Sequence, residues 1–238
     1  MLYRILHPGY AVVTSLLLML VIALLSGCQA LRARPDISYA VGAVAETLSS
    51  NVSLSHTTSE RSISGSGYLM LRKPDHIRVV ILSPFGSVLQ EIYVSGELVT
   101  IIDAGNGLAF TGSYMDLPDR SDFSAWRYIH WLIDIDPPNP LRSTAVIERI
   151  NRFGSPEKAV FENGFLISKT TEKGGSVGYS RYTAVQGVAV PLEIKYITAA
   201  KEEFSLTFEE PEVNVPFADG AFTPQLDTFR VYPLSSLK

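Results

Sequence analysis

The stretch that decides the fold is "SGSGYLMLRKPDHIRVVILSPFGSVLQEIYVSG", residues 64–96. It holds three runs rich in Val, Ile, Leu and Tyr, which at this length are typical of β-strands. The runs are separated by "KPD" and by "SPFGS" (residues 83–87). Short spacers with Pro or Gly connect neighbouring antiparallel strands. The stretch therefore predicts an antiparallel meander.

The same pattern extends in both directions from this stretch. Alternating or apolar runs bounded by Gly, Asn and Pro precede and follow it, and a second series begins after residue 158. The tail at 213–226 has too many turn residues for a central strand. We expect further strands within residues 52–56, 97–103, 108–112, 159–168, 176–185, 190–198 and 202–210.

Apolar residues recur at helical spacing in three places, which predicts three helices beside the sheet. The first follows Asp36, a residue type that suits a helix N-cap. The second occupies residues 119–135, and the third follows a Pro-rich joint at 137–140. Strands in series with a few helices on one side indicate an α+β fold. The residues that carry the three patterns are Ile37, Val41, Val44, Ala45 and Leu48; Phe123, Trp126, Ile129 and Ile133; and Val146, Ile147 and Ile150.

Several of the expected strands are apolar on both faces. Residues 68–71, 79–82 and 98–102 run almost without a polar interruption. An antiparallel sheet with one face in water should alternate instead, so both faces of these strands should be shielded. Two interpretations fit: a sheet buried between helices and its own curvature, or a curved sheet whose concave face lines an apolar cavity closed by the helices.

The first 27 residues have the pattern of a secretory signal. Arg4 precedes an uncharged apolar run at 11–25, and small residues follow it. This run is shorter than the ~20 residues that a membrane-spanning helix needs. We therefore expect residues 1–27 to be removed. Cys28 is the one cysteine of the chain, so neither an internal disulfide nor a Cys-based metal site is expected.

"LSGC" at 25–28 resembles the lipobox of bacterial lipoproteins, in which the cysteine carries the lipid. The resemblance implies a covalent lipid on Cys28 and an acylated tether at 28–36. Gln29 in place of Asp implies the outer membrane, facing the periplasm, under the sorting rule of that class. The alternative is a stray cysteine near a cut signal. The net charge of −4 argues against a nucleic-acid partner.

The chain lacks a recognisable catalytic constellation. His56, His76 and His130 are not spaced as metal ligands, and no Gly-x-Ser-x-Gly nucleophile motif occurs. We therefore expect no enzymatic activity, no catalytic residue, no metal and no cofactor other than the lipid on Cys28. The carboxylates that stand close together are interpreted as solvated charges: Asp134 and Asp136, and Glu209, Glu210 and Glu212.

The mature chain as a whole resembles the LolA/LolB lipoprotein-carrier superfamily. The similarity rests on residues 64–96 with their Pro-Phe-Gly loop, on "VPLEIKY" (190–196) and on "EPEVNVPFADGAFTP" (210–224). The resemblance implies a single domain over 37–238, built as an open curved antiparallel sheet (a half-barrel) with a helical lid over an apolar cavity. The lipobox favours LolB, the membrane-anchored receptor, over the soluble LolA.

The resemblance also implies two kinds of functional residue. Pro84, Phe85 and Gly86 would form a loop that engages the membrane through the Phe ring. The alternative is an ordinary type I turn whose ring folds back onto Leu82 or Val88. The apolar cavity would hold acyl chains, and the candidates for its lining are Leu69, Leu71, Val79, Ile81, Ile92, Val94, Ile101, Phe123, Trp126 and Ile129.

The function implied is that of an acyl-chain carrier that helps insert lipoproteins into the outer membrane. Its partners would be lipidated proteins, outer-membrane lipid and a soluble LolA-like donor. The rival is a structural envelope lipoprotein that uses the same fold to bind a protein partner. The rival predicts a filled cavity and an apolar patch on the outer surface.

Overall fold

The computed structural model describes residues 37–118, 121–138, 144–151, 154–171 and 175–237, all within one compact unit, Pro35–Lys238. The predicted signal at 1–27 and the predicted tether with Cys28 lie outside the described residues and stay predictions. Among the described helices, none has the length and apolar content needed to cross a membrane.

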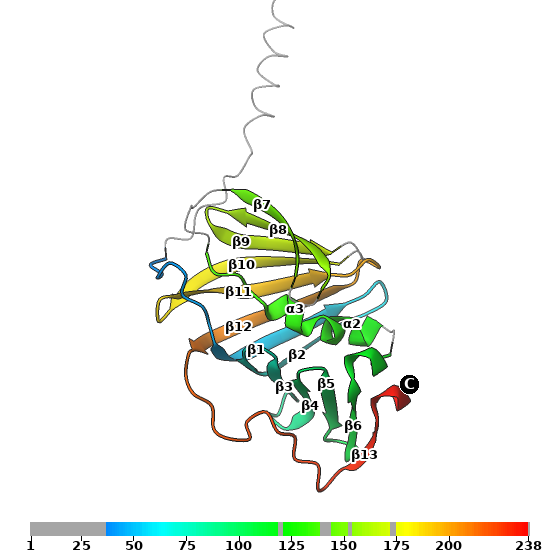
Figure 1. Ribbon diagram of the computed structural model, residues 1–238. Helices are drawn as coiled ribbons and strands as arrows, with labels where there is room; N and C mark the ends of the chain where they lie inside the picture. The colour runs from blue at the N-terminus through cyan, green and yellow to red at the C-terminus, as the bar shows by residue number, and fades with distance from the viewer. Residues whose placement is uncertain (1–36, 119–120, 139–143, 152–153, 172–174, 238) are drawn as a thin grey trace, which may run out of the picture. The chain divides into compact units, whose positions relative to one another are not determined.

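The unit is built on one sheet of thirteen strands (Figure 1). Their order across the sheet is β13-β6-β5-β4-β3-β2-β1-β12-β11-β10-β9-β8-β7. Every neighbouring pair is antiparallel except β13 with β6. The two outermost strands, β13 and β7, do not pair with each other, so the sheet is open. The strands are β1 (Thr47–Thr57), β2 (Ser62–Arg72), β3 (His76–Leu82), β4 (Val88–Ser95), β5 (Leu98–Asp103), β6 (Leu108–Ser113), β7 (Ala145–Ile150), β8 (Pro156–Glu162), β9 (Phe165–Thr171), β10 (Ser176–Val185), β11 (Val188–Ile197), β12 (Glu203–Val213) and β13 (Arg230–Pro233).

Two meanders meet in the middle of this sheet. Strands β1 to β6 pair in chain order, which confirms the meander predicted from residues 64–96, and β7 to β12 form the second one. β12 then pairs with β1, so the last long strand lies beside the first. In the first meander Val79 of β3 stands opposite Leu69 of β2 and Ile92 of β4, which places these three side chains on one face.

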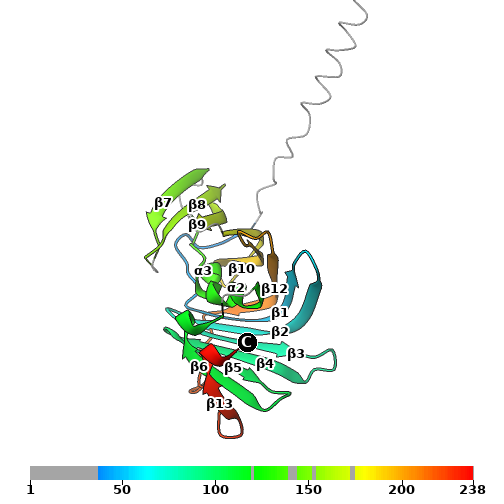
Figure 2. The same cartoon turned by 90° about the vertical axis from the view of Figure 1, so that its right-hand side faces the viewer.

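The helices are few and short, and they follow β6 in the chain. They are η1 (Tyr114–Asp116), α2 (Ser121–Arg127) and α3 (Ile129–Ile133), with η2 (Leu234–Ser236) near the C-terminus. Both views place α2 and α3 over one face of the sheet, near β1 and β12 (Figures 1 and 2). We call this the inner face. The predicted mid-chain helical segment is confirmed, but it is smaller than the lid that was expected.

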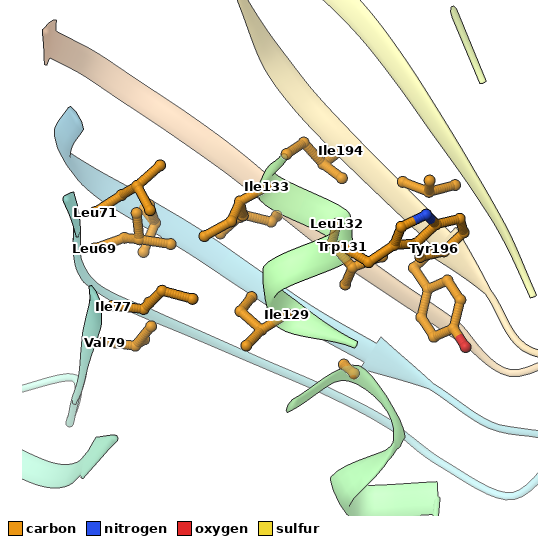
Figure 3. Close-up of a cluster of buried hydrophobic side chains, with 14 of the residues drawn as sticks. Leu69, Leu71, Ile77, Val79, Ile129, Trp131, Leu132, Ile133, Ile194 and Tyr196 are labelled. Atoms are coloured by element: carbon orange, nitrogen blue, oxygen red, sulfur yellow. The ribbon is translucent and has the colours of Figure 1, made fainter. Parts of the chain in front are cut away.

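Helix α3 fills the centre of the inner face. All five of its residues are buried. Figure 3 shows Ile129, Leu132 and Ile133 between side chains of β2 and β3 on one side and of β11 on the other. Burying an aliphatic side chain contributes about 1.5–3 kcal/mol. A helix as short as α3 is therefore held by packing and not by its own hydrogen bonds.

The outer face is shielded in part by the C-terminal segment. Tyr93, Ile102 and Ala109 form a separate buried cluster with Leu226 and Phe229 packed against it. The apolar residues of β5 thus alternate between the core under the helices and this outer cluster. That explains why β5 is apolar on both faces. The tail after β12 forms no central strand among the described residues, as predicted. The strand that follows it, β13, lies at the edge of the sheet.

The predicted helix at 37–48 is wrong. Residues 37–46 form turns and irregular backbone, and β1 begins at Thr47. Gly42 adopts a φ of +77°, which an α-helix does not contain. The N–H of Ala40 donates to the carbonyl of Gly187 at 2.8 Å. The segment therefore follows the sheet as irregular backbone, although the spacing of its apolar residues fits a helix.

The predicted helix around residues 145–150 is also wrong, because this segment is strand β7. It pairs with β8 over its whole length, with Val146 opposite Val160. Val146, Ile147 and Ile150 are exposed instead of buried on one helical face. β-Branched residues favour strands. Pairing with β8 therefore makes this segment a strand, although its apolar residues also fit helical spacing.

Candidate functional site

A cavity of about 380 Å³ lies between α2 and the inner face of the sheet. Its size falls within the ~300–1,000 Å³ of typical small-molecule sites. The walls come from β1 to β5, from β12 and from α2. The apolar residues that line it are Leu54, Ile63, Ile81, Ile92, Ile101, Phe123, Ala125, Trp126 and Phe204.

Helix α2 covers this cavity with aromatic side chains. Phe123 and Trp126 are three residues apart, which places them on the same side of the helix. The Trp126 ring meets the Phe204 ring of β12 edge-on, with 5.9 Å between centroids. Both helix residues are half-buried and pack against the main core. One side of the cavity is therefore a short aromatic helix and the other is the sheet.

We call the end of the cavity nearest the turn between β1 and β2, where His56 and Arg61 lie, its mouth. His56 shares the inner face with Leu54, because alternate residues of a strand point the same way. It stands opposite Ile63 in β2 and Phe204 in β12. Among the described residues that line the cavity, none is a carboxylate. The polar residues of the lining are Ser55, His56, Arg61, Ser64 and Gln90. A mainly apolar lining with a few polar residues and, among those described, no carboxylate suits an amphiphilic ligand.

The predicted cavity residues divide into two groups. Five of them line the cavity: Ile81, Ile92, Ile101, Phe123 and Trp126. The other five lie in the packed core instead, because α3 occupies the centre of the inner face. Leu69 and Leu71 border a space of only about 30 Å³ beside Ile133. Val79, Val94 and Ile129 are buried core side chains.

A buried polar cluster fixes α3 to the second meander. The Lys169 ammonium donates to the backbone oxygens of Trp131 and Asp134, at 2.7 Å each. The Tyr179 hydroxyl donates to the backbone oxygen of Leu132 at 3.0 Å. Carbonyls in the last turn of a helix have no partner within it. Side chains of β9 and β10 thus supply the hydrogen bonds that α3 cannot make itself.

Glu157 connects the same cluster to β7. It accepts hydrogen bonds from Nε1 of Trp131 (2.7 Å) and from Nε of Arg149 (2.6 Å). Arg149 also binds both carboxylate oxygens of Asp136, at 3.0 and 2.6 Å. The interpretation of Asp136 as a solvated charge is therefore wrong, whereas Glu209, Glu210 and Glu212 are exposed as expected.

The ionisation of the cluster follows from its burial. Desolvation lowers the pKa of Lys169 to about 8, against the attraction of neighbouring carboxylates. Burial alone would raise the pKa of Glu157, but hydrogen bonds from Trp131 and Arg149 outweigh it and lower the pKa. Sequence reasoning missed Lys169, Glu157 and Arg149. A lysine and a glutamate at inward positions of otherwise apolar strands are the signal that could have found them.

The Pro-Phe-Gly loop between β3 and β4 is a tight, internally bonded turn. The Gly86 N–H donates to the Ser83 carbonyl at 2.9 Å, which makes Pro84 and Phe85 the central residues of a β-turn. The Ser83 N–H donates to the Ser87 carbonyl at 2.8 Å, and the two serine hydroxyls lie 2.7 Å apart. The loop therefore holds its shape without help from the side chain of Phe85.

The Phe85 ring points into solvent. Its exposed fraction is 98%, so the alternative in which it folds back onto Leu82 or Val88 is wrong. Ser66 pairs with Leu82, the last residue of β3, so residues 62–65 of β2 extend beyond that strand toward the loop. The Phe85 loop and the mouth of the cavity therefore lie at the same end of the strands.

No protein-family model matches this sequence, and no curated protein matches it. Solved structures do match. The crystal structure of a DUF1329 family protein from Desulfovibrio piger is 13% identical, with a TM-score of 0.58 over 75% of this chain and 90% of that one. A putative outer membrane lipoprotein-sorting protein domain from Vibrio parahaemolyticus is 7% identical, with a TM-score of 0.57 over 74% and 89%.

A LolA superfamily protein from Nitrosomonas europaea is 14% identical, with a TM-score of 0.50 over 75% of this chain and 90% of that one. At such identities the similarity concerns the fold. The large open sheet with a few short helices on its inner face is thus a LolA-like fold.

Proposed function

We propose that this protein is a lipid-anchored carrier of acyl chains that helps insert lipoproteins into the outer membrane, as LolB-like receptors do. The observation that carries the proposal is the apolar cavity of about 380 Å³ under α2. It opens at the end of the strands where Phe85 is exposed. The LolA-like fold, shared with a lipoprotein-sorting domain, supports the same function.

Such a carrier needs no bond-making chemistry. An acyl chain leaves water for the cavity because burial of apolar surface contributes about 25 cal/mol per Å². It leaves the cavity for a bilayer when the bilayer buries more of that surface. We infer that the partners are lipidated proteins, a soluble LolA-like donor and the outer-membrane lipid. No catalytic residue, metal or cofactor has a part in this mechanism.

Within this proposal, Phe85 is the contact with the membrane. A ring at the tip of a tight turn enters the acyl–headgroup boundary without any movement of the sheet. The lipid on Cys28 would keep the domain at the membrane, and stable anchoring takes more than one acyl chain or a second membrane signal. The outer membrane, facing the periplasm, is the proposed location.

The rival function also has specific support. Helix α3 fills the centre of the inner face, and the edge strand β7 exposes Val146 and Ile150 at 55% and 65%. A partly filled sheet with an apolar edge suits a structural lipoprotein that pairs with another envelope protein. The two functions differ in one respect: the carrier must bind acyl chains, and the structural protein need not.

Saturable binding of a fluorescent fatty acid to domain 35–238 tests the proposal. We expect binding that unlabelled fatty acid displaces. Phe123→Ser should weaken this binding about tenfold, which corresponds to the lower end of the free energy that burial of an aromatic ring contributes. Phe110→Ser is the matched control, since Phe110 is half-buried on β6 outside the cavity. Absence of saturable binding to the unaltered domain would favour the structural protein.

A further inference from the structure

Two glycines face the inner side of β2, and the structure explains one of them. Gly65 and Gly67 are two residues apart and share a face with Leu69. Glycine weakens the interior of a strand and often marks a place where something approaches the backbone closely. A Cβ on Gly67 would come within 2.1 Å of the Val80 carbonyl oxygen. The neighbouring strand therefore requires glycine at position 67.

None of the described residues requires glycine at position 65. Among them, a Cβ there would meet Cγ2 of Ile81 alone, at 3.9 Å, which is ordinary contact. Gly65 is not among the residues with positive φ, so its backbone suits other residues as well. It lines the cavity, close to the mouth. A side chain at this position would occupy the cavity, and its absence leaves room for a ligand.

We propose that Gly65 determines which ligands enter, by letting one acyl chain of an amphiphile lie across the backbone of β2 on its way into the cavity. This rests on the proposed acyl-chain binding and specifies its ligand. The chain would run from the mouth over Gly65 to the apolar end formed by Ile92 and Ile101. The volume of about 380 Å³ is near the lower limit for small-molecule sites, which suits one chain.

The mouth defines the chemistry of the other end of the ligand. Arg61 is the one lysine or arginine among the described lining residues, and His56 lines the same end of the cavity. A guanidinium binds carboxylate and phosphate oxygens through charge-assisted hydrogen bonds. With no carboxylate among the described lining residues, an anionic head meets no opposing charge from them. The site therefore favours one acyl chain of its ligand with an anionic oxygen group beside it.

The first test compares Gly65→Leu with Ser66→Leu in domain 35–238. Ser66 is the next residue of β2 and points to the opposite, exposed face. We expect Gly65→Leu to weaken laurate binding at least tenfold while raising the thermal midpoint, because it fills a cavity. Ser66→Leu should leave the affinity unchanged. Gly65→Ala, a smaller change, should weaken binding two- to fivefold and provides the test if the leucine variant does not fold.

The second test varies the head of the ligand. Laurate and dodecyl phosphate should bind at least fivefold more tightly than dodecanol, which has a chain of the same length and no charge. Arg61→Gln should remove this preference and leave dodecanol binding unchanged. Equal affinity for the three ligands would overturn the anionic head. Preference for one acid over the other would identify which head the mouth accepts, a carboxylate or a phosphate.

The outcomes separate this inference from the function on which it rests. If the unaltered domain binds no acyl ligand, the proposed function fails. If it binds laurate and the Gly65 variants bind it equally well, the carrier function stands and the role of Gly65 is overturned. Weaker binding together with a lowered thermal midpoint would also overturn that role, because it would show damage to the sheet instead of a filled cavity.

Discussion

Replacing Phe85 by serine should weaken the contact with membranes and leave the fold intact. The ring is 98% exposed, and the turn beneath it is closed by backbone and serine hydrogen bonds. The free energy of unfolding should therefore change by no more than about 0.5 kcal/mol. If the ring enters the bilayer, its burial contributes about 1.5–3 kcal/mol. Its loss then reduces partitioning into vesicles by a factor of about 10–100.

Co-sedimentation of domain 35–238 with phosphatidylethanolamine–phosphatidylglycerol vesicles measures this partitioning without the lipid anchor. Met115→Ser is the matched control. Met115 is 90% exposed but follows β6, at the opposite end of the strands from the Phe85 loop. We expect Phe85→Ser to reduce binding and Met115→Ser to leave it unchanged. Equal effects of the two substitutions, or none from Phe85→Ser, would refute the membrane-contact role.

Three further predictions concern the residues that hold α3 in place. Lys169→Met should lower the free energy of unfolding by about 2–4 kcal/mol, measured by urea unfolding at pH 7, because two buried carbonyls lose their donor. A change below 1 kcal/mol would show that the cluster is not needed for stability. Because burial lowers the pKa of Lys169 to about 8 from 10.5, the unfolded chain binds more protons between these values. The stability of the unaltered domain relative to Lys169→Met should therefore rise by about 2 kcal/mol from pH 7 to 9.5, and a fall over that range would contradict the assignment. Leu132→Ala should lower the free energy of unfolding by about 2–5 kcal/mol, as for other fully buried leucines. A loss as small as that for an exposed leucine would place α3 outside the core.

The strands could be predicted because their signals are local. Residues 64–96 combine strand-length apolar runs with tight turns, and neighbouring segments of this kind pair with each other. The helix at 145–150 could not be excluded in the same way. Val146, Ile147 and Ile150 fit helical spacing, and only pairing with β8 makes that segment a strand. The parallel pairing of β13 with β6 likewise depends on where the tail returns.

The cavity was predicted in kind but only partly in position. Alternation identifies which residues face inward, but it does not say which of them α3 covers. Four candidates on the sheet therefore lie under α3 or in the core beside it, and the fifth, Ile129, belongs to α3 itself. The cluster of Lys169, Glu157 and Arg149 joins strands whose contact depends on the whole sheet. By contrast, the Pro-Phe-Gly turn is local. The structure combines the β-turn of one alternative with the outward-pointing ring of the other.

The central claim is that the cavity under α2 holds an acyl chain. Native mass spectrometry of domain 35–238, purified from cells without added detergent, tests it most directly. We expect a fraction of the protein with an added mass equal to one acyl amphiphile, absent from Gly65→Leu and retained in Ser66→Leu. A spectrum with only the bare protein mass, in a domain that also fails to take up added laurate, would contradict it.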